Sequence, residues 1–379
     1  MLRRKKLDFI QEEVWMMEFR QAPMAFSLFF FSSDSEAAGG GRYDHLLEIA
    51  RLADEAGFQA IWTPERHFHR FGGIFPNPAV ISAAIAAQTK RIRIRAGSVL
   101  LPFHHPIRAA EDWSIVDNLS GGRVDLAVTY GWHPRDYVFA PDVFETRKQV
   151  LFDRLETMQR LWRGESLNFP SATGEDTPAR IYPQPVQARL PIWITTSRTV
   201  ETWRKAGEIG ANILTALYAI DQRTLSENIA VYRAARAAAG HEGEGTVTAM
   251  LHTFIGECME EVREVVRKPF IEYILRHTEL YDEAAVAKAL DIDPSLITDK
   301  HRRTLASMSF ERYIKNSSLI GTLETASTMV ASMSAIGVNE IACLIDFGVP
   351  HEQVKQSLIW LDRLRMAHGN PDQGKEIRA

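Results

Sequence analysis

The stretch from Ile92 to Thr129 reads IRIRAGSVLLPFHHPIRAAEDWSIVDNLSGGRVDLAVT, and it predicts one strand–helix–strand unit. Residues 92–101 form a run typical of a strand that ends at a proline, and residues 124–129 form a second apolar run. Between them, residues 106–119 have helical spacing and are followed by the turn Ser-Gly-Gly-Arg. A strand, a helix and a second strand in this order predict two parallel strands joined by a covering helix.

The same alternation continues on both sides of this unit. Further strands are expected at 25–31, 60–63, 191–195, 212–216, 247–255 and 340–345. Further helices are expected at 43–57, 77–88, 147–163, 200–209, 225–239 and 322–336. The first of these strands is an almost unbroken apolar run, which is typical of a parallel strand covered on both faces. Eight strands alternating with helices predict an α/β fold, a (β/α)8 TIM barrel, in preference to a doubly wound open sheet.

The expected barrel spans residues 25–348 and contains one insertion. Residues 258–318 are charged and helical in pattern with no strand, which predicts a helical insertion before the last β/α unit. Residues 1–24 are expected to form an N-terminal extension, and residues 349–379 a C-terminal helix with a loose polar tail. The basic residues of the insertion leave two interpretations open, a docking face for an acidic carrier domain or a solvated helical cover over a pocket.

Composition excludes several classes of function. The 379 residues are 45% hydrophobic and 24% charged, with a formal net charge of -4, as in an ordinary globular protein. A slightly acidic chain does not suit the phosphate backbone, so no nucleic-acid partner is expected. The sequence has no apolar run of membrane-spanning length, and acidic residues interrupt its start, so neither a membrane segment nor a signal peptide is expected. Two distant cysteines, Cys258 and Cys343, favour a cytoplasmic location.

The strongest chemical signal follows the expected strand at 191–195. Thr196, Ser197, Arg198 and Thr199 lead directly into a helix. Hydroxyls, a cation and the free backbone N–H groups of a helix N-terminus favour an anion such as phosphate. An ordinary helix cap without a ligand is the alternative. The sequence has no Walker A motif and no GxGxxG between a strand and a helix, so a dinucleotide on a Rossmann half is not expected.

A second set of polar residues suggests a metal site as an alternative. His67 and His69 follow the second expected strand, and Asp346 follows the eighth. In a metal-dependent barrel hydrolase, imidazoles hold a metal that activates water. Arg66 and Arg70 flank the two histidines, and a cation beside a metal ion is unfavourable. We therefore expect no metal here.

Several separate motifs resemble the bacterial luciferase-like family of flavin-dependent monooxygenases. They are AIWTPERHF at 60–68, GSVLLP at 97–102, DNLSGGR at 117–123 and GWHPRDY at 131–137. With the loop at 196–199, the resemblance covers most of residues 25–255. The residues of the last motif, together with the insertion, most resemble the subgroup found beside polyketide and nonribosomal-peptide assembly lines.

The resemblance implies a non-covalently bound reduced FMN across the top of the barrel. Because the sequence has no NAD(P)H fingerprint and no second nucleotide domain, a separate flavin reductase is expected to supply it. The resemblance implies a reaction with O2 to a flavin C4a-hydroperoxide, which oxygenates an organic substrate. The subgroup implies an acyl or aminoacyl intermediate of natural product biosynthesis, either free or tethered to a carrier protein, and a homodimer is expected. Hydroxylation, Baeyer–Villiger insertion and N-oxidation all stay open.

The resemblance also implies which residues hold the flavin. Thr196, Ser197 and Thr199 fall where the family grips the phosphate, with Arg198 adding charge. Gly97 and Ser98 fall beneath the isoalloxazine ring, where the family has a cis peptide bond. The other positions expected at the flavin are Thr129, Trp132 and Tyr137. Core packing is the alternative for Trp132, and a surface loop is the alternative for Tyr137.

Two positions depart from the family pattern. The family often has an arginine for the phosphate just after the fourth strand, where this sequence has Thr129-Tyr130, so phosphate binding is expected to depend on the loop at 196–199. The family's Glu-His-His-Phe is here Glu65-Arg66-His67-Phe68, so an arginine replaces the histidine credited with acid–base work. Arginine stays protonated in proteins and does not serve as a general base. We expect Glu65, Arg66 and His67 to form the catalytic set, with Glu65 orienting His67. Arg66 would stabilise a peroxide anion or hold a carboxylate or phosphate of the substrate.

Three other functions stay open from the sequence. A deazaflavin- or flavin-dependent reductase or dehydrogenase would use the same fold and a similar cofactor site. A flavin-binding subunit without catalysis of its own would account for the missing histidine. The metal-dependent barrel hydrolase is the third alternative.

Overall fold

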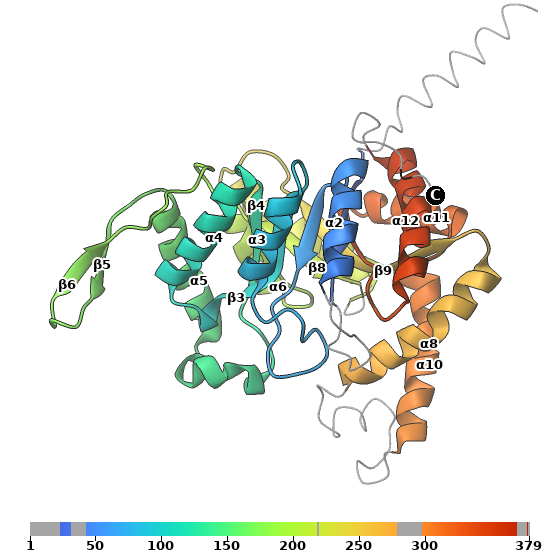
Figure 1. The fold of residues 1–379 in the computed structure, drawn as a ribbon. Helices are drawn as coiled ribbons and strands as arrows, with labels where there is room; N and C mark the ends of the chain where they lie inside the picture. The colour runs from blue at the N-terminus through green and yellow to red at the C-terminus, as the bar shows by residue number, and fades with distance from the viewer. Residues whose placement is uncertain (1–22, 32–42, 218–219, 279–297, 370–376, 378–379) are drawn as a thin grey trace, which may run out of the picture.

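The computed structural model describes residues 23–31, 43–217, 220–278, 298–369 and 377. Eight parallel strands form a closed barrel, which is completed by the pairing of β11 with both β1 and β9 (Figure 1). The strands are β1 (Ala25–Phe29), β2 (Ala60–Thr63), β3 (Arg93–Leu100), β4 (Val124–Thr129), β7 (Ile192–Thr195), β8 (Asn212–Ala216), β9 (Val247–Gly256) and β11 (Glu340–Leu344). The predicted (β/α)8 TIM barrel is therefore confirmed.

Helices cover the outside of the barrel (Figure 1). They are α2 (Asp44–Ala56), α3 (Pro78–Gln88), α4 (Pro106–Ser120), α5 (Arg147–Trp162), α6 (Val200–Glu208), α7 (Gln222–Ala238), α11 (Leu323–Ala335) and α12 (His351–His368). None of the described helices combines the length and the apolar character needed to cross a membrane.

Local sequence sets the ends of these helices. The side chain of Asn77 accepts hydrogen bonds from the amides of the second and third residues of α3, at 3.0 and 3.2 Å. Gly57 ends α2 in the left-handed region with φ +86°. Helix α7 begins at Gln222 rather than at residue 225, because Asp221 accepts a hydrogen bond from the Thr224 amide at 2.8 Å and caps the helix there.

Two features outside the barrel were not predicted. An antiparallel hairpin of β5 (Leu167–Pro170) and β6 (Asp176–Ala179) projects away from the barrel (Figure 1). Its residues are exposed or only half-buried, so the hairpin lacks the apolar pattern that marks a core strand. Short 3-10 helices follow β3 and β4; they are η1 (Leu101–Phe103), η2 (Pro134–Phe139) and η3 (Pro141–Val143).

The described part of the expected insertion consists of α8 (Met259–Thr278) and α10 (Asp299–Asn316). A further strand, β10 (Ser318–Thr322), begins at the last residue of the range 258–318, which corrects the expectation that this range has no strand. Strand β9 pairs with β11 along its first half and with β10 along its second half. The insertion therefore leaves the sheet from β9 and returns to it beside β9.

The two chain ends lie largely outside the described residues. This holds for residues 1–22 of the expected N-terminal extension and for residues 370–376, 378 and 379 of the expected loose tail. Helix α12 lies within the range 349–379, where a C-terminal helix was expected.

A buried charge cluster fills the barrel near the amino ends of its strands. Arg95 of β3 is 3% exposed, and it donates hydrogen bonds to Asp125 at 2.6 Å and to Glu340 at 2.7 and 2.8 Å. The indole rings of Trp62 and Trp193 lie 4.8 and 4.4 Å from the guanidinium carbon. Residues at this end of a TIM barrel serve stability, so the cluster closes the end opposite the chemistry.

Candidate active site

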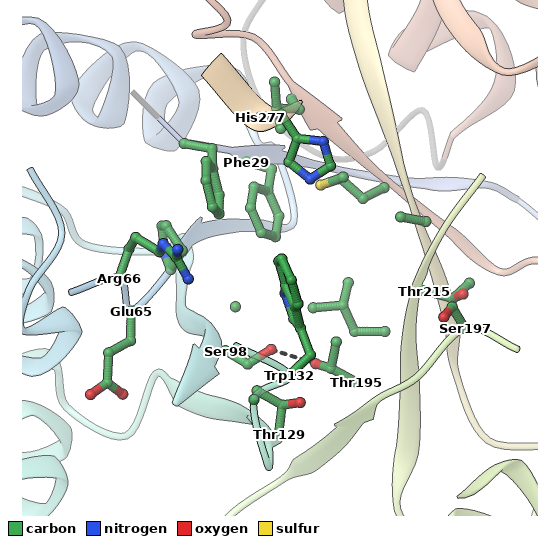
Figure 2. A pocket seen from close by; sticks show the side chains of 18 of the residues that line it. Phe29, Glu65, Arg66, Ser98, Thr129, Trp132, Thr195, Ser197, Thr215 and His277 are labelled. Carbon is green, nitrogen blue, oxygen red and sulfur yellow. Dashed lines mark hydrogen bonds between the residues drawn. The ribbon is translucent and has the colours of Figure 1, made fainter. Parts of the chain in front are cut away.

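A cavity of about 340 Å³ lies at the carboxyl ends of the barrel strands (Figure 2). This is the end of a TIM barrel that carries catalysis. Most of the predicted site residues line it: Glu65, Arg66, Gly97, Ser98, Thr129, Trp132, Thr196, Ser197 and Thr199. The other three predicted residues, His67, Tyr137 and Arg198, do not line it.

The loop between β7 and α6 forms one wall of this cavity. Thr199 is the N-cap of α6 and its side chain makes no capping hydrogen bond; the Thr202 amide donates to the Thr199 carbonyl at 3.0 Å, which leaves the amides of Val200 and Glu201 at the start of the helix without a capping side chain. The carbonyl of Ser197 accepts hydrogen bonds from Trp203 at 2.8 Å and from Asn228 at 3.3 Å, which fix the loop. Arg198 is exposed and does not line the cavity, so its expected charge contribution to a phosphate stays a prediction.

The floor of the cavity lies at the end of β3. The Gly97–Ser98 peptide bond is cis, as the resemblance implies. The hydroxyls of Ser98 and Thr195 are hydrogen-bonded to each other (Figure 2). A Cβ on Gly97 would lie 2.8 Å from the Phe29 ring and 3.0 Å from the Trp62 ring, so only glycine lets these rings approach the strand.

These features fit a flavin. The helix N-terminus suits a phosphate, and the glycine floor suits a flat ring system. The hydroxyl of Thr215 is buried in the wall and has no hydrogen-bond partner among the described residues, so it is available to a ligand. The donor set is therefore compatible with the cofactor that the sequence motifs imply.

Glu65 is fully enclosed by hydrogen-bond donors. Its carboxylate accepts from His67 at 2.9 Å, from His104 at 2.7 Å and from the Leu100 amide at 2.8 Å. Burial opposes ionisation, but these donors outweigh it and hold the pKa of Glu65 below its ordinary value. Burial also opposes the charged form of His104, yet the bond to Glu65 raises the pKa of His104. Glu65 is thus ionised and holds two histidines in place. The sequence analysis did not identify His104 as one of them.

The Glu65–His104 pair is expected to give folding stability a pH signature. The lowered pKa of Glu65 stabilises the fold above about pH 4.5, its ordinary pKa, and this contribution is lost as pH falls through the lower folded value. The raised pKa of His104 stabilises the fold below about pH 6.5, and this contribution is lost as pH rises through the higher folded value. We expect Glu65→Gln to lower Tm and to flatten Tm against pH on both sides, whereas His104→Asn flattens the alkaline side and only part of the acid side, because His67 and the Leu100 amide still hold down the pKa of Glu65. A Glu65→Gln profile parallel to that of the wild type would contradict this assignment.

His67, expected in the catalytic set, and Tyr137, expected at the flavin, both pack beside the cavity rather than in it. His67 lies against Phe139 and Phe103, with ring centroids 4.8 and 6.0 Å away. Tyr137 is buried, its hydroxyl donates to the Tyr130 carbonyl, and burial raises the pKa of Tyr137 to about 12. Neither the surface-loop alternative for Tyr137 nor a direct cofactor contact matches this placement.

Trp132 and Arg66 do lie at the cavity. Trp132 is 49% exposed at the rim, so core packing does not describe it. Arg66 is buried, and its Nη1 donates to Asp136 in η2 at 2.6 Å. Burial lowers the pKa of Arg66 despite the Asp136 charge, but arginine starts so high that it stays protonated at neutral pH.

The insertion supplies a wall that the sequence did not assign to the site. Tyr273, Ile274 and His277 of α8 and Tyr313 of α10 line the cavity, as does His252 of β9. These positions lie in a charged helical segment and on a strand, and no local motif marks them. The contribution of α8 and α10 supports the helical-cover interpretation of the insertion.

The metal alternative finds no support in the positions of its candidate ligands. His67 is hydrogen-bonded to Glu65, the His69 ring accepts from the Phe71 amide, and Asp346 accepts from the Phe31 amide at 2.6 Å. Within the described ranges, His67, His69 and Asp346 are not gathered within ligand distance of one point. The described group that is so gathered is His45, Glu48 and His351, and there Lys355 already pairs with Glu48 at 2.8 Å.

The barrel and its cavity define a TIM-barrel enzyme with its chemistry at the carboxyl ends of the strands. The sequence model of the luciferase-like monooxygenases matches residues 24–340, so the chain belongs to the luciferase-like monooxygenase family. It is an oxidoreductase, a flavin-dependent monooxygenase of this family, as the motifs at 60–68 and 131–137 predict.

Relatives and solved structures agree with this placement. The oxygenase component of flavin-dependent trigonelline monooxygenase from Acinetobacter baylyi is 25% identical over 328 residues, which cover 83% of this chain and 87% of that protein. Monooxygenase RslO1 from Streptomyces bottropensis superposes with a TM-score of 0.76 at 21% identity, over 91% of this chain and 99% of that one. The oxygenating constituent of 3,6-diketocamphane monooxygenase from Pseudomonas putida, in complex with FMN, has a TM-score of 0.67 at 19% identity, over 91% and 96%. The coenzyme F420-dependent tetrahydromethanopterin reductase from Methanopyrus kandleri has a TM-score of 0.69 at 15% identity, over 92% and 99%. At these identities the three structures show the fold alone.

Proposed function

We propose that this chain is the oxygenase component of a two-component monooxygenase, which receives reduced FMN from a separate flavin reductase. The observation that carries the proposal is the phosphate-type site at the start of α6, which shares one cavity with the glycine floor of β3. A relative named as an oxygenase component and a fold neighbour that binds FMN support it. O2 is the co-substrate, with one oxygen atom entering an organic substrate and the other leaving as water.

Each part of the cavity has a role in this proposal. When bound, reduced FMN supplies the two electrons that activate O2. Thr196, Ser197 and Thr199 bind the phosphate with their hydroxyls and with the amides of α6. Gly97 and Ser98 support the ring system, while the buried walls exclude water from the reacting atoms.

The proposed substrate is an acyl or aminoacyl intermediate of natural product biosynthesis, free or held on a carrier protein. The motif at 131–137 and the insertion support it through their resemblance to that subgroup. The insertion's arginines give little support to docking of an acidic carrier, because Arg263 and Arg267 both pair with Glu311 at 2.9 Å. Exposed Val80, Ile115 and Leu119, on the neighbouring helices α3 and α4, support a homodimer.

Titration with FMN and F420, combined with O2 uptake, tests this function. We expect FMN to bind with one molecule per chain, and O2 uptake to require both a flavin reductase and NAD(P)H. Rapid NAD(P)H oxidation by the chain alone would contradict the separate reductase. Binding of F420 in preference to FMN would favour a reductase or dehydrogenase instead, a candidate supported by the shared fold of the F420-dependent reductase.

A further inference from the structure

The guanidinium of Arg66 has donors that the protein does not use. Nη1 is held by Asp136 at 2.6 Å, while Nε and Nη2 are buried without a hydrogen-bond partner among the described residues. The residue is only 7% exposed. Buried unpaired donors of a charged group are unfavourable, so their retention calls for a ligand that accepts from them.

The two unused nitrogens form a matched pair. Nε and Nη2 lie on one side of the planar guanidinium, and their N–H bonds are parallel, as two carboxylate oxygens require for a bidentate contact. Arg66 lines the cavity and its guanidinium points inward, whereas the Glu65 carboxylate points away from it (Figure 2). Asp136 fixes the opposite side of the group, which leaves this edge presented to a ligand.

Asp136 also lines the cavity and balances the charge of Arg66 from the opposite side, so the unused donors of Arg66, rather than net charge, favour an anion at this edge. Among the described residues that line the cavity, Arg66 is the one lysine or arginine. Burial, with the neighbouring His277, lowers the pKa of His252 to about 3, and burial, with the charge of Arg66, lowers the pKa of His277 to about 4. Both histidines are therefore neutral at pH 7, and the Glu65 carboxylate is already saturated by three donors.

The wall beyond Arg66 is aromatic. Phe71 lies against Phe31, Tyr273 and His277, with ring centroids 4.9, 4.8 and 5.4 Å away. All four rings line the cavity. Such a wall suits a flat apolar body, which stacks on ring faces and meets ring edges.

We propose that the substrate is an organic carboxylate with an aromatic or unsaturated body, and that Arg66 binds its carboxylate side-on through Nε and Nη2. This inference rests on the proposed function, since it names the substrate class of the same cavity. The FMN phosphate is held on the other side of the cavity, by the loop that leads into α6.

Paired acids and amides test this inference on the full-length, FMN-loaded protein. The probes are benzoate, cinnamate and 3-phenylpropionate, each compared with its neutral carboxamide by calorimetric titration. We expect at least one acid to bind the wild type about tenfold or more tighter than its amide, because two charge-assisted hydrogen bonds are lost in the amide. Arg66→Lys keeps the charge but loses the two parallel N–H donors, so it is expected to retain only part of this preference for the acid.

Variants separate Arg66 from general effects. The double variant Arg66→Gln, Asp136→Asn removes both charges without leaving a buried carboxylate unpaired, and it is expected to bind acid and amide alike. Arg267→Gln on the outer side of α8 removes the same kind of charge outside the cavity, and it is expected to keep the full preference. The FMN affinity of every variant is measured in parallel. It is expected to stay within about threefold of the wild-type affinity, which is a change of less than 1 kcal/mol in the free energy of FMN binding.

Three results would overturn the inference. These are equal affinity of every acid and its amide for the wild type, no binding of any acid, or an unchanged preference in the double variant. A large loss of FMN affinity in the double variant would assign Arg66 to the flavin instead. If the wild type fails to bind FMN but keeps an acid preference that depends on Arg66, the proposed function fails and the carboxylate site stands.

Discussion

Replacing Ser197 with aspartate is expected to weaken FMN binding by roughly 10- to 150-fold, because a hydrogen bond to a charged group contributes about 1.5–3 kcal/mol. The new carboxylate would also repel the phosphate at the start of α6, where the helix dipole and free amides favour one anion only. Fluorescence titration of FMN measures the effect.

The control for this variant is Thr177→Asp on the exposed hairpin strand β6, which adds the same charge far from the cavity. FMN affinity is expected to be unchanged in the control. Unchanged FMN affinity in Ser197→Asp itself would place the phosphate elsewhere.

Replacing Arg95 with methionine is expected to lower the free energy of unfolding by about 3–5 kcal/mol. Removal of the guanidinium leaves the Glu340 carboxylate, at 2% exposure, buried without a counter-charge, and it leaves Asp125, at 0% exposure, with Arg93 alone. Urea denaturation of the full chain measures the loss, and failure of the variant to fold would agree with it.

Arg93→Met is the matched comparison for Arg95→Met. Arg93 also donates to Asp125, at 2.7 Å, but its side chain is 27% exposed. Because water screens Arg93 and Arg95 still neutralises Asp125, we expect a smaller loss of stability. Equal losses in the two variants would refute the role assigned to the barrel cluster.

The barrel was predictable because its signal is local. The strand from Arg93 to Leu100, the turn after α4 and the strand from Val124 each carry their own pattern over a few residues. Strand β10 was missed because it has five residues and follows a long helical segment, so its apolar run merges with the neighbouring pattern. The hairpin was missed because its residues are not buried.

The cavity was predictable only where its residues belong to a motif. The loop that ends at Thr199 was found because it follows a strand directly, and Gly97 was found through its motif within β3. The pairing of Glu65 with His104 and the wall containing His252 depend on contacts between distant parts of the chain. The periodicity of a single strand or helix does not indicate such contacts. The alternation of Arg95 with apolar residues likewise indicates a strand, but it does not predict the pairing of Arg95 with Asp125 and Glu340.

The return of the insertion to the same strand that it leaves has a consequence for how this enzyme diversifies. The insertion leaves β9 after Gly256 and re-enters the sheet at Ser318, which is the partner of His252 of β9, so both joints lie along β9. A replacement segment of another length or sequence closes across these joints without moving the eight strands or the loop that ends at Thr199. Exchange of this one contiguous block would therefore remodel the wall formed by α8 and α10 while leaving the opposite loop, which ends at Thr199, unchanged.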